Sequence, residues 1–110
     1  MNQGEIWLTN LNPVEGSEQA GFRPVVIISG NLLNKYANVV VCCPLTTKLK
    51  NYHGNLILSP TPQNGLSKTS EVLTLHVRSL SKSRLKQHIG TLSKSEMTKI
   101  HKCLNEILTY

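Results

Sequence analysis

Three residues carry groups that could act on a phosphate: an arginine, a threonine and a glutamate. Arg23 directly precedes the β-branched run Pro24–Ser29, where its planar guanidinium can hold a phosphate through two parallel hydrogen bonds. Thr46 follows another apolar run, and both its hydroxyl and its backbone N–H could reach phosphate oxygens. Glu18 precedes Arg23 in a polar loop and could act as a base or only orient the arginine. Residue types alone also allow Arg23 to be a surface arginine paired with Glu18, and Thr46 to cap a strand end.

Cations and aromatic rings elsewhere in the chain could bind a nucleic acid. The candidate backbone contacts are Lys48, Lys50, Arg78, Lys82, Arg84 and Lys86. A solvated charged face is the alternative for each of them. Tyr52 lies among lysines and could stack on a base, or be an ordinary loop tyrosine. Gln19 could hydrogen-bond a nucleic acid and Phe22 could stack on it, although Phe22 could instead pack inside the protein.

The composition describes one small basic domain, covering residues 1–110. Twelve Lys and Arg oppose six Glu and no Asp, so the formal net charge is +6. Hydrophobic residues make up 39% of the chain and charged residues 16%, which is typical of a globular protein. The positive charge favours a polyanionic partner such as RNA, DNA, an acidic protein or a membrane surface.

The cysteines and histidines do not form a pattern that holds a metal. Cys42 and Cys43 are adjacent, so their side chains should point to opposite faces of a strand. There is no Cys-x-x-Cys, and the four histidines are scattered, so we expect no metal and no cofactor. We expect buried, reduced thiols in the cytoplasm. We also expect no signal peptide and no membrane span, because the longest apolar run, Val39–Leu45, is too short.

Apolar patterns predict several short strands and little else before the C-terminus. The predicted strands are Gly4–Thr9, Pro24–Ser29, Val39–Cys43, Asn55–Leu58, Glu71–Ser79 and Gln87–Thr91. A helical turn is predicted at Leu32–Tyr36, and Pro44 is expected to end its strand. In the strand 71–79, alternation places His76 on one face with Arg78, and Leu75 in the core.

The C-terminal segment predicts an amphipathic helix. Ser93 and Glu96 have the spacing of a capping box, and Leu92 and Met97 that of a hydrophobic staple. The apolar face consists of Met97, Ile100, Leu104, Ile107 and Leu108. Short strands followed by one helix favour a mainly β fold, a small curled barrel closed by a C-terminal helix.

The order of these features resembles the MazF/PemK family of toxin endoribonucleases. The family signature G-E-I-W … L-x-P … G-S-E-Q-x-G-x-R-P-V-V-V-I-S is matched nearly residue for residue from Gly4 to Ser29. Further matches are Pro44–Thr47, Val77–Leu80, Lys82–Leu85 and Ile89–Leu92. The resemblance implies an SH3-like small β-barrel of the MazF/PemK/CcdB type and a homodimer. It also implies metal-independent cleavage of single-stranded RNA, and inhibition by a cognate antitoxin protein.

By this resemblance Arg23 and Thr46 are catalytic, and Glu18 is a candidate base or orienting group. Thr47 joins the RNA-binding candidates, as part of the Pro44–Thr47 match. The sequence departs from the family before Arg78, where an acid and a glutamine are common and this chain has Leu75 and His76. An imidazole can titrate near neutral pH and a glutamine cannot. His76 could therefore share in proton transfer, or only replace the glutamine as a hydrogen-bonding partner.

A binding toxin of the same fold is the alternative function. Gyrase-poisoning relatives of this fold end in Trp-Gly-Ile, whereas this chain ends in Leu108-Thr109-Tyr110. A weakened nuclease that mainly binds its antitoxin is a second form of this alternative. The presence of Glu18, Arg23 and Thr46 together favours the nuclease.

Overall fold

The computed structural model describes residues 1–11 and 22–110. The predicted site residues Glu18 and Gln19 lie outside these ranges. The strands are β1 (Glu5–Asn10), β2 (Phe22–Ile27), β3 (Val39–Thr46), β4 (Ile57–Leu58), β5 (Ser70–Val72), β6 (Arg78–Ser81) and β7 (Leu85–Thr91). The helices are α1 (Asn31–Tyr36) and α2 (Lys94–Thr109), and two 3₁₀ turns are η1 (Thr74–His76) and η2 (Lys82–Arg84).

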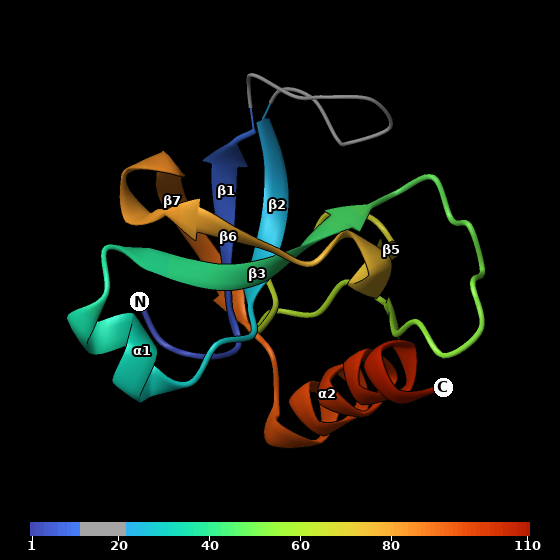
Figure 1. Cartoon of the computed structure of the whole chain (residues 1–110). Coiled ribbons are helices and arrows are strands. Elements are labelled where there is room, and N and C mark those ends of the chain that lie inside the picture. The colour runs from blue at the N-terminus through green and yellow to red at the C-terminus, as the bar shows by residue number, and fades with distance from the viewer. Residues whose placement is uncertain (12–21) are drawn as a thin grey trace.

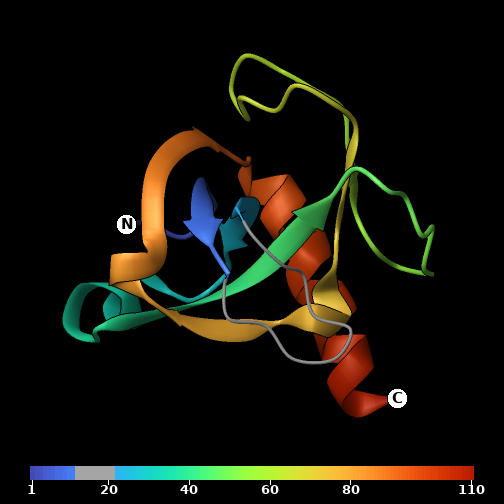
Figure 2. The ribbon, with the colours of Figure 1, turned by 90° about the horizontal axis from the view of Figure 1, so that it is seen from above.

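The strands form one curled antiparallel sheet beside the C-terminal helix. Their order is β4-β5-β3-β2-β1-β7, and β6 also pairs with β3. Figure 1 shows β3 crossing in front of β1 and β2, with α2 below the sheet, and Figure 2 shows the same sheet curving around its own interior. The expected fold, mainly β and barrel-like with a C-terminal helix, is confirmed.

Each face of the central strands packs against its own hydrophobic cluster. Val26, Cys43 and Leu45 belong to the cluster that includes Met97 and Ile100 of α2. Val25 and Cys42 belong to a second cluster, with Val40, Leu80 and Leu85. The adjacent cysteines therefore do face opposite ways, as alternation along a strand requires.

The prediction that Pro44 ends its strand is wrong, because β3 continues to Thr46. Pro44 pairs with Val25 of β2, and its carbonyl accepts a hydrogen bond from the backbone N–H of Leu73 at 2.9 Å. A strand residue points its carbonyl and its N–H to the same side. A backbone N–H at position 44 would therefore point away from β2, toward the place where the partner of β3 changes from β6 to β5. Few ladder hydrogen bonds form at that place, so proline is tolerated there.

The prediction of one strand from Glu71 to Ser79 is also wrong. On one side of β3 the register is Leu45 with Val72, and farther along it is Cys42 with Arg78. Between these two pairs β3 advances by three residues, whereas the strand beside it advances by six. Three residues must therefore leave the ladder between β5 and β6. They form the 3₁₀ turn η1. Alternation does not hold across this turn, and the Leu75 side chain is 63% exposed instead of lying in the core.

The capping box of α2 is confirmed. The Ser93 backbone N–H donates to Glu96 Oε1 at 2.8 Å, and the Glu96 N–H donates to Ser93 Oγ at 3.2 Å. Met97 and Ile100 are buried as expected, but Leu108 is 76% exposed, so the predicted apolar face is not covered along its whole length. No helix in the described ranges is long and apolar enough to span a membrane.

Candidate active site

Two of the predicted catalytic residues lie near the ends of two paired strands, β2 and β3. β2 and β3 pair antiparallel, with Ile27 beside Cys42 and Val25 beside Pro44. The paired register ends at Val25 and Pro44, and Arg23 and Thr46 each lie two residues beyond that pair. Both residues still lie within their strands. Because they are separated by even numbers of residues from Val25 and Cys42, they share the sheet face of the second hydrophobic cluster.

Arg78 lies on the same sheet face. It is the direct partner of Cys42 across β3 and β6, four positions before Thr46 along β3. Burial raises the pKa of the Cys42 thiol to about 12, although the Arg78 charge lowers it. Cys42 is therefore a neutral core residue, and the guanidinium is close enough to influence it. The face thus presents two guanidinium groups and one hydroxyl.

The backbone around Arg23 and Thr46 is held by hydrogen bonds. Thr9 is fully buried, and its Oγ1 donates to the carbonyl oxygen of Arg23 at 3.0 Å. Thr46 is only 4% exposed, and its Oγ1 accepts the Lys48 backbone N–H at 3.1 Å. That contact uses the hydroxyl as an acceptor, so its proton can be donated to a phosphate oxygen. Sequence reasoning missed Thr9; a polar residue inside a buried strand was the available signal.

The segment 47–56, exposed as far as Gly54, leaves β3 directly after Thr46 and carries several RNA-binding candidates. Thr47, Lys48, Lys50 and Tyr52 are all exposed there. Asn51, between the last two, has a left-handed backbone with φ of 54°. The segment therefore presents two cations and an aromatic ring next to the strand end that carries Thr46. Figure 1 shows it extending away from β3 on the side of β5.

A buried carboxylate holds this segment in place. Glu71 is fully buried in β5 and is the direct strand partner of Thr46. Its Oε1 accepts the backbone N–H of Lys50 at 2.6 Å and of Asn51 at 2.8 Å. Its Oε2 accepts the N–H of Tyr52 at 3.2 Å and the Nδ2 of Asn55 at 2.8 Å.

These hydrogen bonds decide the charge state of Glu71. Burial alone would raise the pKa of the carboxyl, but the bonds from Asn55 and the three backbone amides outweigh it and lower the pKa below the ordinary 4.5. Glu71 is therefore ionised at neutral pH and is a poor proton acceptor. Sequence analysis overlooked this residue, although a single acid between a buried serine and a valine of a strand was a signal, because buried acids need partners.

Of the two remaining aromatic candidates, Phe22 does not share the face of Arg23. Phe22 directly precedes Arg23 in β2, so alternation turns it to the other face, where it is 62% exposed. It does not pack inside the protein. Tyr52 lines a hollow of about 260 Å³ together with His53, Asn55, Leu75 and Ile107.

Two basic candidates lie at the far end of β3. Lys82 follows Ser81, whose strand partner is Val39, the first residue of β3. Its Nζ donates to the carbonyl oxygen of Asn34 in α1. Arg84 belongs to the same turn, η2, and one of its guanidinium nitrogens is buried. The structure does not bring Lys82 and Arg84 together with Arg23 and Thr46.

His76 is placed by the turn η1 and not by strand alternation. Its backbone N–H donates to the Leu73 carbonyl at 3.0 Å, and η1 packs against both α2 and β3. Two residues later Arg78 starts β6. The predicted common face of His76 and Arg78 therefore has no support from the backbone, since a 3₁₀ turn lies between them.

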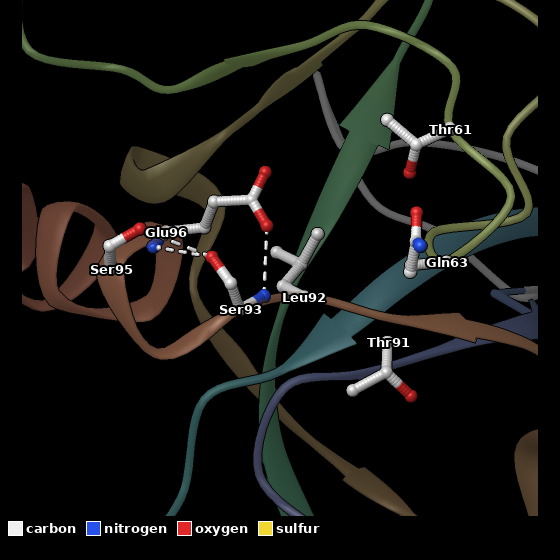
Figure 3. Close-up of a pocket in the computed structure, with 7 residues that line it drawn as sticks. All are labelled: Thr61, Gln63, Thr91, Leu92, Ser93, Ser95 and Glu96. Atoms are coloured by element: carbon white, nitrogen blue, oxygen red, sulfur yellow. Dashed lines mark hydrogen bonds between the residues drawn. The ribbon is translucent and has the colours of Figure 1, made fainter.

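The hollow of about 540 Å³ at the start of α2 contains none of the predicted site residues. Its lining is Thr61, Gln63, Thr91, Leu92, Ser93, Ser95 and Glu96. Figure 3 shows the Glu96 carboxylate turned back to the Ser93 backbone, so the capping box uses its charge. This hollow has no pair of groups resembling the arginine and threonine of the sheet.

Metal-binding side chains are not clustered in the described part of the chain. No group of three or more His, Cys, Asp or Glu residues in residues 1–11 and 22–110 is arranged to hold an ion. Cys42, Cys43 and Cys103 are buried free thiols. Burial raises the pKa of Cys43 to about 12 as well, so it is protonated at neutral pH.

Comparison with known proteins gives the family. The family model for the PemK-like, MazF-like toxin of type II toxin-antitoxin systems matches residues 2–108. The chain belongs to this family. It is 34% identical to an endoribonuclease MazF of Staphylococcus saprophyticus, and 35% identical to one of Staphylococcus epidermidis. Each comparison covers 96% of this chain and 88% of the relative.

Solved structures of MazF proteins share the fold. A MazF crystal structure from Deinococcus radiodurans superimposes with a TM-score of 0.85 at 25% identity, covering 100% of this chain and 97% of that one. A MazE–MazF structure from the same organism gives a TM-score of 0.78 at 27% identity, covering 98% and 95%. The MazF/PemK resemblance of the sequence is thereby confirmed.

Proposed function

We propose that this toxin is a metal-independent, sequence-selective endoribonuclease that cleaves single-stranded RNA. In this reaction the RNA's own 2′-OH attacks the adjacent phosphorus, and the products carry a 2′,3′-cyclic phosphate and a 5′-OH. The observation that supports it is the pairing of β2 with β3, since Arg23 and Thr46 each lie two residues beyond the pair Val25–Pro44 and share one sheet face by alternation. The names of the two staphylococcal relatives agree with an endoribonuclease.

The two residues supply what such a reaction needs most. As the 2′-OH attacks, negative charge builds up on the phosphorane oxygens, and fixed donors aimed at that charge lower the barrier. Arg23 provides a delocalised cation with paired donors, and Thr46 provides a hydroxyl proton. Both residues lie within hydrogen-bonded strands, so we expect little reorganisation at the moment of reaction.

The reaction also needs groups that take a proton from the 2′-OH and give one to the leaving oxygen. Glu18 is our candidate for the base or for the group that orients Arg23. Leu75 cannot take a proton, and the Glu71 carboxylate is occupied by four hydrogen bonds. For His76 we propose a contact to RNA, with proton transfer as the alternative. If His76 transfers protons, His76→Gln changes the pH dependence of the rate, whereas loss of a contact changes only the rate or the sequence preference.

The partners follow from charge and family. The protein would act in the cytoplasm as one domain of residues 1–110, and as a homodimer. A formal charge of +6 on each chain attracts both RNA and an acidic antitoxin. Relatives of known structure include a MazE–MazF complex, which supports a cognate antitoxin here. Thr47, Lys48, Lys50, Tyr52 and Arg78 are the RNA-binding residues nearest to Thr46, and Gln19 and Phe22 remain candidates.

Arg23→Ala tests this function directly. Removing one donor to a developing anion costs roughly 10²–10³ in rate, so the variant should lose at least that much in single-turnover cleavage while its circular dichroism and melting stay normal. Thr46→Ala should lose a similar or smaller factor. Lys94→Ala, which removes one exposed cation at the start of α2, is the charge-matched control and should cleave normally. Wild-type cleavage by Arg23→Ala would refute the assignment.

A further inference from the structure

The affinity of the segment 47–56 for RNA depends on whether its backbone is already ordered before RNA binds. It carries Lys48 and Lys50, whose side chains are exposed, and long exposed side chains contribute little to fixing a backbone. Binding to RNA would be weakened if the whole segment had to be ordered at the same time, because ordering each residue costs conformational entropy. A segment that is already ordered presents its cations without that cost.

Hydrogen bonds from the backbone of this segment to the side chains of Thr46 and Glu71 hold it in place. Lys48 is held through its backbone N–H on Thr46 Oγ1, and Lys50 through its backbone N–H on Glu71 Oε1. The chain then turns at Asn51, and Asn51 and Tyr52 donate to the same carboxylate. Every one of these contacts leaves the lysine ammonium groups and the tyrosine ring available to a ligand.

Glu71 also borders the candidate catalytic threonine. The two residues are direct partners in the antiparallel ladder of β3 and β5, and such partners have their Cβ atoms about 5 Å apart on one face. The carboxylate therefore connects the strand end at Thr46 with the cations that follow it in sequence. No other carboxylate in the described residues accepts three successive backbone N–H groups.

We propose that Glu71 is a positioning residue for RNA binding: its buried carboxylate fixes the backbone of residues 48–52 so that Lys48, Lys50 and Tyr52 hold the RNA strand beside Thr46. This proposal rests on the proposed function. Glu71 acts through these residues and touches no RNA itself. A negative group would otherwise be an unfavourable neighbour for a polyanion, but here its charge is offset by four donors.

The experiment compares Glu71→Gln with Glu5→Gln. Both variants remove one negative charge, and Glu5 accepts a hydrogen bond from the Trp7 indole, away from the segment. Amide hydrogen exchange is measured at Lys50, Asn51 and Tyr52 without RNA. Affinity is measured by anisotropy with a labelled 2′-O-methyl RNA of mixed sequence, which cannot be cleaved because it lacks the attacking hydroxyl. Cleavage of ordinary RNA is measured separately.

For Glu71→Gln we expect the three amides to lose protection and the Kd to rise roughly 10-fold, the effect of removing about one charge-assisted hydrogen bond. The slope of log Kd against log salt concentration should become shallower by about 0.7 for each phosphate that the lysines no longer neutralise. Cleavage at saturating RNA should change less than about threefold, because the weakened binding is common to ground state and transition state. Glu5→Gln should match wild type in all of these.

A double-variant cycle tests whether Glu71 acts through the lysines. If it does, removing both lysines (Lys48→Ala with Lys50→Ala) weakens binding in wild type but adds little to Glu71→Gln. Additive effects on Kd would overturn the proposal, as would reduced amide protection with unchanged Kd and salt slope. Should Glu71→Gln not fold, Asn55→Ala removes only one of the four donors and should shift the same readouts by a smaller factor.

The two proposals fail in distinguishable ways. If wild-type protein binds the 2′-O-methyl RNA but cuts no ordinary RNA, the nuclease assignment is wrong and the role of Glu71 is still decided by the anisotropy data. If wild type binds no RNA at all, both are overturned.

Discussion

Two long connections of this fold are anchored in different ways. The segment 47–56, between β3 and β4, is held by the charged carboxylate of Glu71. The segment 59–69, between β4 and β5, is held by the neutral amide of Asn64. Its Oδ1 accepts the N–H groups of Thr61 and Leu66, each at 3.0 Å, and its Nδ2 donates to the Ser59 carbonyl at 2.9 Å.

Close backbone packing adds to the second anchor. Gly65 and Gly90 lie where the segment meets β7, and a Cβ on Gly90 would come within 2.3 Å of the Asn64 carbonyl. The segment 59–69 is thus fixed by shape and by a side chain that cannot titrate near neutral pH. The segment 47–56 has a looser neighbour, since a Cβ on Gly54 would lie 3.3 Å from the Cys103 sulfur, and the Glu71 carboxylate accepts three of its backbone N–H groups. Under the proposed function, we expect the segment 59–69 to support the fold and the segment 47–56 to present its lysines to RNA.

The largest effect on stability should come from disrupting the close packing of Gly90 against Asn64. Gly90→Ala forces two backbones apart, and we expect a loss of about 3 kcal/mol in the free energy of unfolding. Gly30→Ala is the matched control, because a Cβ there has nothing within 4 Å; it should change stability by less than about 0.5 kcal/mol. Urea unfolding measures both. Equal stability of the two variants would contradict the close packing.

The hydrogen bonds of the Asn64 amide should affect the stability of the fold and not the affinity for RNA. Asn64→Ala leaves two N–H groups and one carbonyl without their partner at a position only 2% exposed, which should cost about 2 kcal/mol. The Kd for RNA should stay within about twofold of wild type under conditions where the variant is folded. A tenfold weaker Kd with this variant would show that the two segments are not separate in function.

The smallest effect should appear as a difference in pH response. The folded pKa of Glu71 lies below the ordinary 4.5, so its contribution is fully present above about pH 5. It is lost as the pH falls below 4.5 toward the folded pKa. Amide exchange, corrected for intrinsic rates, should show Lys50 and Asn51 losing protection in this window before Gly65 and Leu66 do. If all four amides lose protection together, the Glu71 carboxylate does not hold the segment 47–56 independently of the segment 59–69.

The sequence was sufficient where a structure depends on neighbouring residues. Ser93 and Glu96 form the predicted capping box because all of its partners lie within one helical turn. Arg23 and Thr46 were chosen from motif and residue type, and their catalytic roles stay predictions. The cysteine pair faces two clusters because alternation within one strand is a local property.

Features that depend on pairing between distant strands were not predicted. The turn η1 arises because β5 and β6 pair with β3 in registers three residues apart, and the pattern of residues 71–79 alone is that of one strand. The same shift makes room for Pro44 within β3. The role of Glu71 depends on a segment about twenty residues earlier folding over it, which a pattern confined to its own strand cannot show.

The central claim concerns the chemistry of cleavage, and the ends of the products test it most directly. Purified protein is incubated with defined RNA in excess EDTA, and the termini are mapped by kinase and phosphatase sensitivity. We predict cleavage without added metal, with a 2′,3′-cyclic phosphate on one product and a 5′-OH on the other. A strict requirement for Mg²⁺, or products with a 5′-phosphate, would contradict the account.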